Sequence, residues 1–221
     1  RTAPGKSTKR SRTHRPRSVP FSTSVDSEMV ATTNDAERKK KIASLVDEFS
    51  PKFPNAPEIT PEVLLSQSAG NPGKYTFNAK PVVVVDVRTH DETEVSVIKN
   101  AVTKKAFEAN LLADPRSLDD HVVVAYCTIG YRSAGYVEKL RSGRNMEAYN
   151  LRGSILAWTH AGGELEDQEK NVTKKVHVFG ESWDLASSDC ESVYFKQPKL
   201  SYVSSLVPDA LKPWRWFGRG K

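Results

Sequence analysis

The sequence is poor in cysteine and has no long hydrophobic run. Its two cysteines, Cys127 and Cys190, are too few for a fold built on disulfides, and they lack the paired spacing of a zinc site. No segment approaches the roughly 18 apolar residues that a membrane-spanning helix needs. We therefore expect no transmembrane segment, no metal and no cofactor, and we expect any chemistry to depend on a single thiol.

Acidic residues are missing from the first 25 positions, where the excess positive charge of the chain is concentrated. The formal net charge is +6. The basic residues of this segment are Arg1, Lys6, Lys9, Arg10, Arg12, Arg15 and Arg17. Because the rest of the chain is close to neutral, nucleic-acid binding could involve only this N-terminal basic arm.

Residues 1–33 combine this charge with many Ser, Thr and Pro residues, and they lack the apolar centre of a secretory signal. This composition is typical of an organellar transit peptide. A disordered basic arm that binds RNA or an acidic partner is the alternative. We interpret 1–33 as a targeting segment or a disordered arm.

A helical pattern begins at Asn34. This residue can cap a helix, and Glu37 follows three positions later, as in a capping box. Apolar residues then recur at helical spacing, namely Ile42, Leu45, Val46 and Phe49. Pro51 and Pro54 should end this helix, so residues 34–56 are predicted as an N-terminal helix and linker. Thr60 should cap a second helix, with Pro61 in its first turn.

Two apolar runs indicate buried strands. One is Val82–Val85, ending in Asp86, and the other is Val122–Ala125, ending in Tyr126 and Cys127. Continuous β-branched runs are typical of central strands of a parallel sheet, and a third strand is expected at 147–151. Strands that alternate with helices predict an α/β fold, a three-layer sandwich with a central, mostly parallel sheet flanked by helices.

Polar groups follow both runs, where sites form in open α/β sheets. They are Asp86 and Arg88 after the first run and Cys127 after the second. The backbone N–H groups of the loop after Cys127 and the start of the next helix can cradle an anion and favour a thiolate. The loop residues are Thr128, Ile129, Gly130, Tyr131 and Arg132.

Two side-chain features of this loop support the anion cradle. Gly130 lets the backbone turn without a Cβ, and the guanidinium of Arg132 can bind either the loop or a bound anion. A buried structural cysteine is the alternative for Cys127. The Cys-x4-Arg spacing, the glycine and the strand-to-helix position together favour the anion-cradling loop.

With these motifs the chain resembles the rhodanese family, as a single domain over residues 57–166. The matching segments are 83–88 followed by Glu92 and Glu94, then 98–101, 127–132, 150–158 and 162–163. Two pairs depart from the usual pattern. Lys99-Asn100 stands where Pro-Gly is common, and Gly153-Ser154 stands where Gly-Gly is usual.

The resemblance implies a sulfurtransferase. Cys127 would take sulfur from thiosulfate or a persulfide donor, hold it as a persulfide against the N–H groups of residues 128–132, and pass it to cyanide or to a small or protein thiol. The related phosphatases have one residue more between Cys and Arg, so the loop length favours sulfur transfer. Asp86 and Arg88 match positions that brace the site, and Trp158 is expected in the core.

The amino-acid sequences of the loop and of the segments after it resemble those of rhodaneses from cyanobacteria and photosynthetic eukaryotes. We therefore expect a plastid (chloroplast) location, with the mitochondrion as the alternative.

The remaining candidates have plainer interpretations. His160 and His177 are expected to pack, although proton transfer is an alternative. Cys190 is expected to be an ordinary thiol rather than a sulfur relay or a disulfide partner of Cys127.

The C-terminal extension, 167–221, ends in an aromatic tail that contains Tyr202, Trp214, Trp216 and Phe217. This tail either packs on its own domain or docks on a protein partner. Two function classes follow for the chain, an organellar sulfurtransferase and a rhodanese-fold scaffold subunit of a large organellar complex.

Overall fold

The computed structural model describes residues 23–68 and 73–195, with backbone alone for 23–33. Helix α1 spans Thr23–Phe49, so Asn34 lies inside it and the predicted cap and capping box are wrong. An N-cap is worth only about 1 kcal/mol, and no Gly or Pro interrupts residues 23–33 to stop the helix there. The predicted end is confirmed, because α1 stops at Phe49 and the 3-10 helix Ser50–Lys52 follows.

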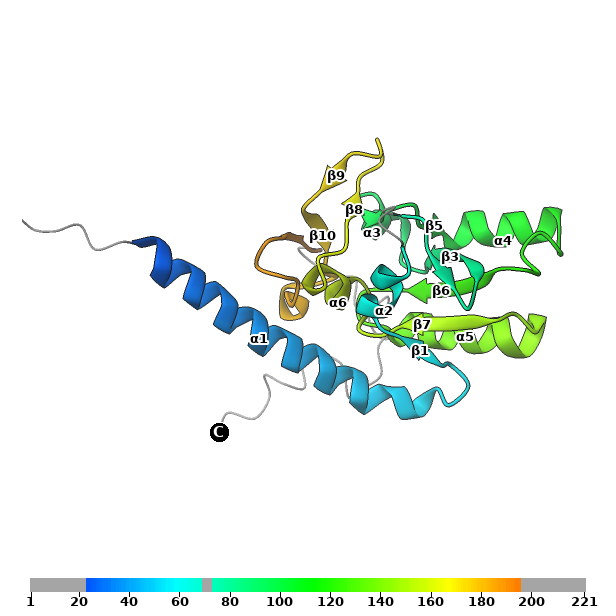
Figure 1. The fold of residues 1–221 in the computed structure, drawn as a ribbon, viewed down its shortest axis with the longest axis horizontal. Helices are drawn as coiled ribbons and strands as arrows, with labels where there is room; N and C mark the ends of the chain where they lie inside the picture. Colours follow the sequence, from blue (N-terminus) through cyan, green and yellow to red (C-terminus); the bar gives the residue numbers. More distant parts are fainter. Residues whose placement is uncertain (1–22, 69–72, 196–221) are drawn as a thin grey trace, which may run out of the picture.

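The central sheet confirms the predicted α/β architecture (Figure 1). Its strand order is β1-β7-β6-β3-β2, and β5 also pairs with β3. Every pairing is parallel except that of β2 with β3. The strands are β1 Glu58–Ile59, β2 Thr76–Phe77, β3 Lys80–Asp86, β5 Val102–Thr103, β6 Val122–Tyr126 and β7 Ala148–Leu151.

Helices cover both faces of this sheet. They are α2 Pro61–Ser66, α3 His90–Thr93, α4 Lys104–Ala113, α5 Tyr131–Arg144 and α6 Ser154–His160. In β6, Val122, Val124 and Tyr126 share one core with residues of α1, α2 and α6. Val123 and Ala125 share the other core with residues of α4 and α5. Both faces of β6 are therefore buried, which explains why its sequence is continuously apolar.

The start of α2 is built as the sequence predicts. The side chain of Thr60 accepts a hydrogen bond from the backbone N–H of Val63 at 3.4 Å, and Pro61 occupies the first turn. Pro61 needs no hydrogen-bond partner at this position, because it has no N–H group.

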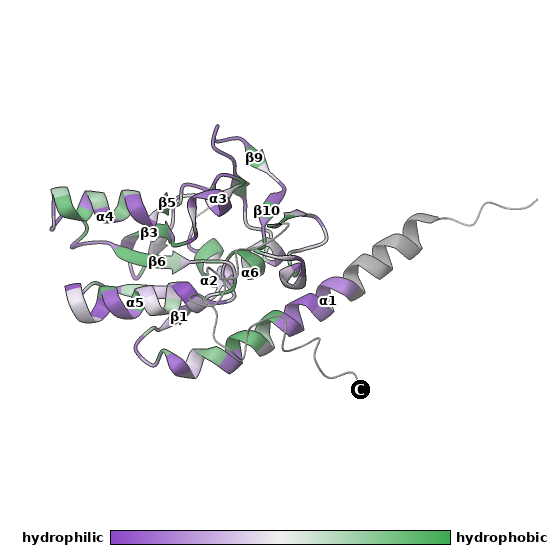
Figure 2. Cartoon of the chain, turned by 180° about the vertical axis from the view of Figure 1, so that it is seen from behind, coloured by the Kyte–Doolittle hydropathy of each residue, from purple (hydrophilic) through white to green (hydrophobic). Residues whose placement is uncertain are grey.

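The C-terminal extension packs on the same core as α1. Strands β8 Leu165–Glu166 and β9 Val172–Thr173 form an antiparallel sheet with β4 Val97–Ile98, and β10 Lys175–His177 pairs with β11 Glu191–Val193. Buried residues of the extension in this core are Val176, Val178, Phe179, Trp183, Leu185 and Ala186. The apolar part of α1 faces the domain in Figure 2. Both flanks of the predicted 57–166 unit thus share its core.

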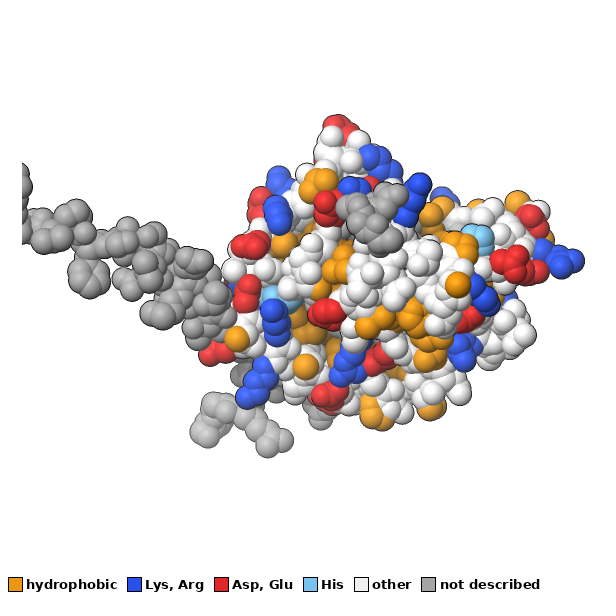
Figure 3. Space-filling model, viewed as in Figure 1, with side chains coloured by type: hydrophobic (Ala, Val, Ile, Leu, Met, Phe, Trp, Pro, Cys, Tyr) orange, Lys and Arg blue, Asp and Glu red, His pale blue; other side chains and the backbone are white. Residues whose placement is uncertain are grey.

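The surface carries charges of both signs. Figure 3 shows acidic and basic side chains interspersed over one face of the domain. None of the helices in the described part of the chain is both long and apolar enough to span a membrane. The basic residues of the predicted targeting segment and the aromatic tail lie in 1–22 and 196–221, outside the described residues.

Candidate active site

The parallel register of β3 and β6 brings the predicted site residues to one edge of the sheet. Asp86 pairs with Tyr126 at the carboxyl ends of these strands, and Cys127 follows Tyr126 directly. The loop from Cys127 then enters α5 at Tyr131. The cysteine therefore lies in the crevice where open α/β sheets place their ligands.

The loop folds back on the sulfur of Cys127. The backbone N–H of Gly130 donates a hydrogen bond to the Cys127 Sγ at 3.1 Å. This geometry needs a left-handed backbone, since Gly130 has φ 114°. A Cβ at this position would come 3.3 Å from the side chains of both Asn150 and Phe49. Glycine thus allows the turn that points an N–H group at the thiol.

The sulfur is buried but is biased toward the thiolate. Cys127 is 1% exposed. Burial by itself raises the pKa of the Cys127 thiol. The positive charge of Arg132, together with hydrogen bonds from Ser133 and Gly130, outweighs burial and lowers this pKa below its ordinary value. The loop can therefore supply a nucleophile near neutral pH.

Arg132 does not point its guanidinium at an open anion site, because Glu92 occupies both of its terminal nitrogens. Nη1 donates to Oε2 of Glu92 at 2.8 Å, and Nη2 donates to Oε1 at 2.7 Å. Nη2 also donates to the Thr128 hydroxyl at 3.1 Å. Of the two roles considered for this side chain, binding the loop is the one the geometry shows, while its charge still acts on Cys127.

Glu92 is the main functional residue that sequence reasoning missed as a site residue. Its side chain is fully buried and also accepts hydrogen bonds from the backbone N–H and hydroxyl of Thr89. Burial raises the pKa of Glu92, but the hydrogen bonds and charge of Arg132 lower it to about 2. One sequence signal could have identified Glu92. It is the Glu of a Thr-x-x-Glu pattern, which marks a helix start, and this helix directly follows a strand that ends in a predicted site residue.

Asp86 and Arg88 form a second buried ion pair beside the loop. Arg88 Nη2 donates to Asp86 Oδ2 at 2.7 Å, and both side chains are fully buried. Nη2 also donates to the carbonyl of Ser96 at 2.6 Å. The pair therefore ties the end of β3 to the segment before β4, which is a bracing geometry.

The C-terminal extension reaches both arginines of the site. Nη1 of Arg88 donates to the carbonyl of His177 at 3.5 Å, and the ring of Phe179 lies 6.0 Å from the guanidinium carbon of Arg132. Phe179 has φ 72°, a left-handed conformation that is unusual for a bulky residue. The extension thus forms part of the wall around the site.

The two departures from the usual glycine pattern keep a glycine-like backbone. Asn100 has φ 60° and Ser154 has φ 51°. The Ser154 hydroxyl accepts a hydrogen bond from the backbone N–H of Cys127 at 3.0 Å. Its side chain therefore satisfies a buried amide of the loop.

The start of α6 holds the loop carbonyls as well. The N–H groups of Ile155 and Leu156 donate to the carbonyls of Cys127 and Thr128, each at 3.3 Å. Helix α6 therefore holds the first half of the loop through these two hydrogen bonds.

Ser133 and Asn150 fix the second half of the loop. Ser133 Oγ donates to Asn150 Oδ1 at 2.6 Å and lies 3.6 Å from the Cys127 Sγ. Asn150 Nδ2 in turn donates to the carbonyl of Gly130 at 3.1 Å. Both side chains are buried, and sequence reasoning did not identify either of them.

Of the remaining candidates, His177 borders the site through its backbone carbonyl, whereas Cys190, His160 and Trp158 make no contact with the loop 127–132. Cys127 and Cys190 are both free thiols, so the alternative of a disulfide between them is wrong for this structure. His160 bonds the carbonyl of Leu185 through Nε2, and His177 Nδ1 accepts from the backbone N–H of Phe179. Trp158 is fully buried in the core. Among the described residues no group of three or more His, Cys, Asp and Glu side chains could hold a metal ion.

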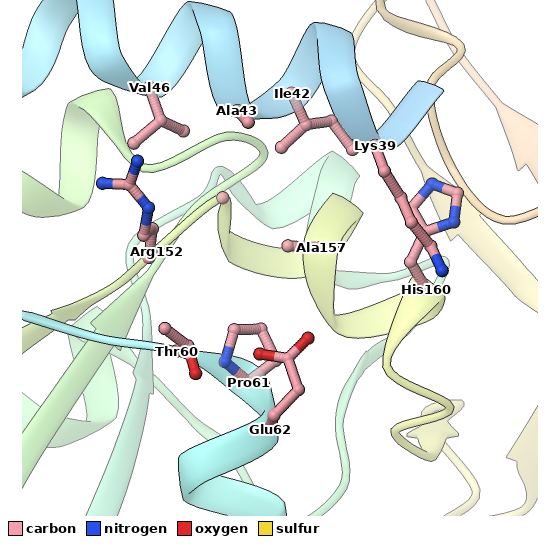
Figure 4. Close-up of a pocket in the computed structure, with 11 residues that line it drawn as sticks. Lys39, Ile42, Ala43, Val46, Thr60, Pro61, Glu62, Arg152, Ala157 and His160 are labelled. Atoms are coloured by element: carbon pink, nitrogen blue, oxygen red, sulfur yellow. The ribbon is translucent and has the colours of Figure 1, made fainter. Parts of the chain in front are cut away.

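A cavity of about 250 Å³ lies between α1, α2 and α6, away from the loop (Figure 4). Lys39 and His160 stand at one end and Arg152 at the other. Arg152 already pairs with Asp47 and Glu58. No residue of 127–132 lines this cavity, so it is separate from the thiol.

Comparison with known proteins matches residues 74–161 to the Rhodanese-like domain. This part of the chain is a rhodanese-like domain. No curated protein matches the sequence.

Solved structures give weak likenesses. A rhodanese-like domain protein from Staphylococcus aureus is 27% identical, with 53% of this chain and 98% of that chain covered and a TM-score of 0.37. A thiosulfate sulfurtransferase from Pseudomonas aeruginosa is 19% identical, with 57% and 23% covered and a TM-score of 0.39. A protein of unknown function from Rhodopseudomonas palustris, described as a possible tyrosine phosphatase, is 18% identical, with 69% and 100% covered and a TM-score of 0.39. At these TM-scores the likeness supports no conclusion about activity.

Proposed function

We propose that this chain, with its rhodanese-like domain at residues 74–161, is a sulfurtransferase that works through a persulfide on Cys127. The donor is thiosulfate or a persulfide, and the acceptor is cyanide or a thiol. The observation that carries the proposal is the hydrogen bond from the Gly130 N–H to the Cys127 Sγ at 3.1 Å, in a loop whose charge lowers the pKa of the thiol.

The first step loads the sulfur. The Cys127 thiolate attacks the outer sulfur of thiosulfate and forms a new S–S bond with it. The S–S bond of thiosulfate breaks, and sulfite leaves with the electron pair. Cys127 then carries a persulfide whose terminal sulfur holds the negative charge, so the step needs no proton transfer and no oxidant.

The second step unloads the sulfur. A nucleophile attacks the terminal sulfur, the bond to Sγ breaks, and the Cys127 thiolate is restored. Cyanide would give thiocyanate, and a thiolate would give a new persulfide. Because one displacement is complete before the other begins, ping-pong kinetics are expected.

Burial of the thiol favours a slender partner. Cys127 is 1% exposed, so a reacting sulfur must approach it at the end of a narrow group. Thiosulfate or a small persulfide meets this requirement, whereas a cysteine set in a flat protein surface does not. Burial would also protect the persulfide from unspecific thiols.

Mass spectrometry of the intact protein after incubation with thiosulfate tests the proposal. We expect the wild-type protein to gain one sulfur, located on the peptide that contains Cys127, and to lose it when cyanide is added. Cys190→Ser provides the matched cysteine control and should still gain the sulfur. A protein that gains no sulfur, or a gain that persists in Cys127→Ser, would overturn the assignment.

The location of the protein stays a prediction. We propose that the protein is located in a plastid, with the mitochondrion as the alternative. This proposal is based on the composition of residues 1–33 and on the amino-acid sequence of the loop.

A further inference from the structure

The end of helix α1 lies against the cysteine loop. Phe49, the last residue of α1, is fully buried. A Cβ on Gly130 would lie 3.3 Å from the Cζ of Phe49. The ring of Phe49 also contacts the ring of Tyr131, with centroids 5.6 Å apart and an interplanar angle of 76°. The helix therefore contacts two consecutive residues of the loop, one of which points its N–H at the sulfur.

A second ring completes an aromatic cluster, which consists of Phe49, Phe53 and Tyr131. Phe53 follows the 3-10 helix Ser50–Lys52, directly after α1. The ring centroids of Phe53 and Tyr131 are 4.9 Å apart, and those of Phe49 and Phe53 are 6.5 Å apart. All three pairs pack edge to face, an arrangement that aromatic rings prefer. Two rings from outside the loop thus hold Tyr131.

The segment after α1 is fixed along the first two turns of α5. The Cε1 of Phe53 lies 3.4 Å from the place of a Cβ on Gly135. The backbone N–H of Asn55 donates to Oε1 of Glu138 at 3.1 Å. Figure 1 shows the end of α1 and the chain after it beside α5. The aromatic cluster is therefore attached to the same helix that begins at Tyr131.

Gly130 needs this packing because its backbone is easily rotated. It has φ 114°, and glycine adopts positive and negative φ with similar ease. Its carbonyl accepts hydrogen bonds from the N–H of Ala134 and from Nδ2 of Asn150. On the side where a Cβ would stand, the ring of Phe49 and the amide of Asn150 fill the space. The ring therefore opposes a rotation of the peptide that carries the Gly130 N–H.

The orientation of this N–H matters for the sulfur, because it donates to the Cys127 Sγ at 3.1 Å. Burial raises the pKa of the Cys127 thiol, and this hydrogen bond is one of the contacts that lower it, after those of Arg132 and Ser133. A rotated N–H would neither stabilise the thiolate nor hold the terminal sulfur of a persulfide. Packing on the far side of Gly130 thus bears on the reactivity of the thiol.

The contact comes from outside the matched domain. Phe49 and Phe53 precede residues 74–161, which match the Rhodanese-like domain. Leu45 and Val46 of the same helix are buried in the core that also contains residues of α6. Helix α1 is therefore a fixed part of the fold, and it supplies the active-site loop with a support that the matched residues do not contain.

We propose that Phe49 and Phe53 are positioning residues of the active site, which hold Tyr131 and Gly130 so that the Gly130 N–H points at the Cys127 sulfur. They act through the loop and not on the reacting atoms. The expected effect on turnover rests on the proposed function, whereas the expected effect on the thiol needs no sulfur transfer.

Alkylation of Cys127 by iodoacetamide over a series of pH values tests the proposal in the full chain. The reaction is followed on the peptide that contains Cys127. We expect Phe49→Leu to move the profile to higher pH, by less than Arg132→Ala, because it loosens one hydrogen bond and removes no charge. Thiosulfate turnover should fall by about three- to tenfold, less than for complete loss of a contact to a charged group.

Leu45→Val is the matched control, because Leu45 is a buried residue of the same helix, one turn before Phe49. It should lower the urea concentration at half-unfolding but leave the alkylation profile in place. A purely structural role of Phe49 would give the same two results for Phe49→Leu.

A double-substitution cycle tests the ring contact itself. Tyr131→Leu should move the alkylation profile in the same direction as Phe49→Leu. The double variant Phe49→Leu/Tyr131→Leu should move it by clearly less than the sum of the two, because each single change already removes the contact between the rings. Fully additive shifts would overturn the proposal.

Phe53→Leu serves where Phe49→Leu does not fold, since Phe53 is partly exposed. Its alkylation profile should also move to higher pH, and with Phe49→Leu unfolded it decides alone. Profiles that superimpose on the wild type, or an equal shift in Leu45→Val, would overturn the inference even if Cys127 carries sulfur. A shifted profile in a protein that takes up no sulfur from thiosulfate would overturn only the proposed function.

Discussion

The carboxylate of Glu92 binds both terminal nitrogens of the Arg132 guanidinium, at 2.8 and 2.7 Å, across 40 positions of sequence. The pair joins the first turn after β3 to the first turn after β6. It thereby ties α3 to α5 beside the loop that begins at Cys127. Each partner leaves an uncompensated buried charge if the other is removed, so neutralising either one should destabilise the fold.

We expect Glu92→Gln to destabilise the protein by about 3 to 5 kcal/mol, because a largely buried guanidinium then loses its counter-charge. Glu94→Gln, at an exposed position two residues later, should stay within about 0.5 kcal/mol of the wild type. Urea unfolding followed by circular dichroism measures both. Equal stabilities for the two variants would show that the pair contributes nothing to the fold.

Substitution of Arg132 should change the reactivity of Cys127 in a defined direction. Arg132→Ala removes the charge that lowers the pKa of the thiol, so alkylation by iodoacetamide should move to higher pH. Thiosulfate turnover should fall on the order of ten- to a hundredfold, since contacts to charged groups are worth about 1.5 to 3 kcal/mol. Arg132→Lys keeps the charge but loses the planar fork of the guanidinium. Its alkylation profile and its turnover should therefore lie between those of the wild type and Arg132→Ala.

The control for this series is Arg116→Ala, which removes an arginine whose side chain is 89% exposed. It should leave the alkylation profile in place. If the profiles of the wild type and Arg132→Ala superimpose, the backbone amides alone must set the reactivity of the thiol.

Two substitutions at Ser154 should separate backbone strain from side-chain bonding. Ser154→Ala keeps the left-handed φ of 51° but leaves the buried N–H of Cys127 without its acceptor, which costs about 1 to 3 kcal/mol. Ser154→Gly loses the same bond but relieves strain of about 1 to 3 kcal/mol. Thermal unfolding should therefore rank Ser154→Gly above Ser154→Ala. The reverse order would contradict the hydroxyl and backbone roles assigned here.

Stability should decline in acid through Glu92. Its pKa is about 2 in the folded protein, below the ordinary value of 4.5. The unfolded chain thus takes up a proton at a higher pH than the folded one, so the stabilisation is complete above about pH 4.5 and is lost as the pH falls toward about 2. The difference in unfolding free energy between wild type and Glu92→Gln should stay constant from pH 7 to 5 and shrink below pH 4. A difference that persists undiminished at pH 3 would show that ionised Glu92 is not its source.

Local pattern was sufficient for the centre of the fold. The runs that form β3 and β6 are continuously apolar because helices cover both faces of the sheet. The residue types of each run are therefore enough to predict that it is buried. The cap at Thr60 and the end of α1 at Phe49 depend on neighbouring residues only, so they too could be predicted. The position of Cys127 after a strand and before a helix followed from the same runs.

Tertiary structure alone decided which side chains contact the loop 127–132. Glu92, Asn150 and Ser154 come from three segments, and their contacts depend on the strand register and on the packing of α6, which no local spacing encodes. The early start of α1 was missed because capping preference is a weak local effect that the absence of a helix breaker overrides. Sequence by itself thus determined the three central strands and the position of the thiol, whereas the groups that tune the thiol were decided by contacts between residues far apart in the chain.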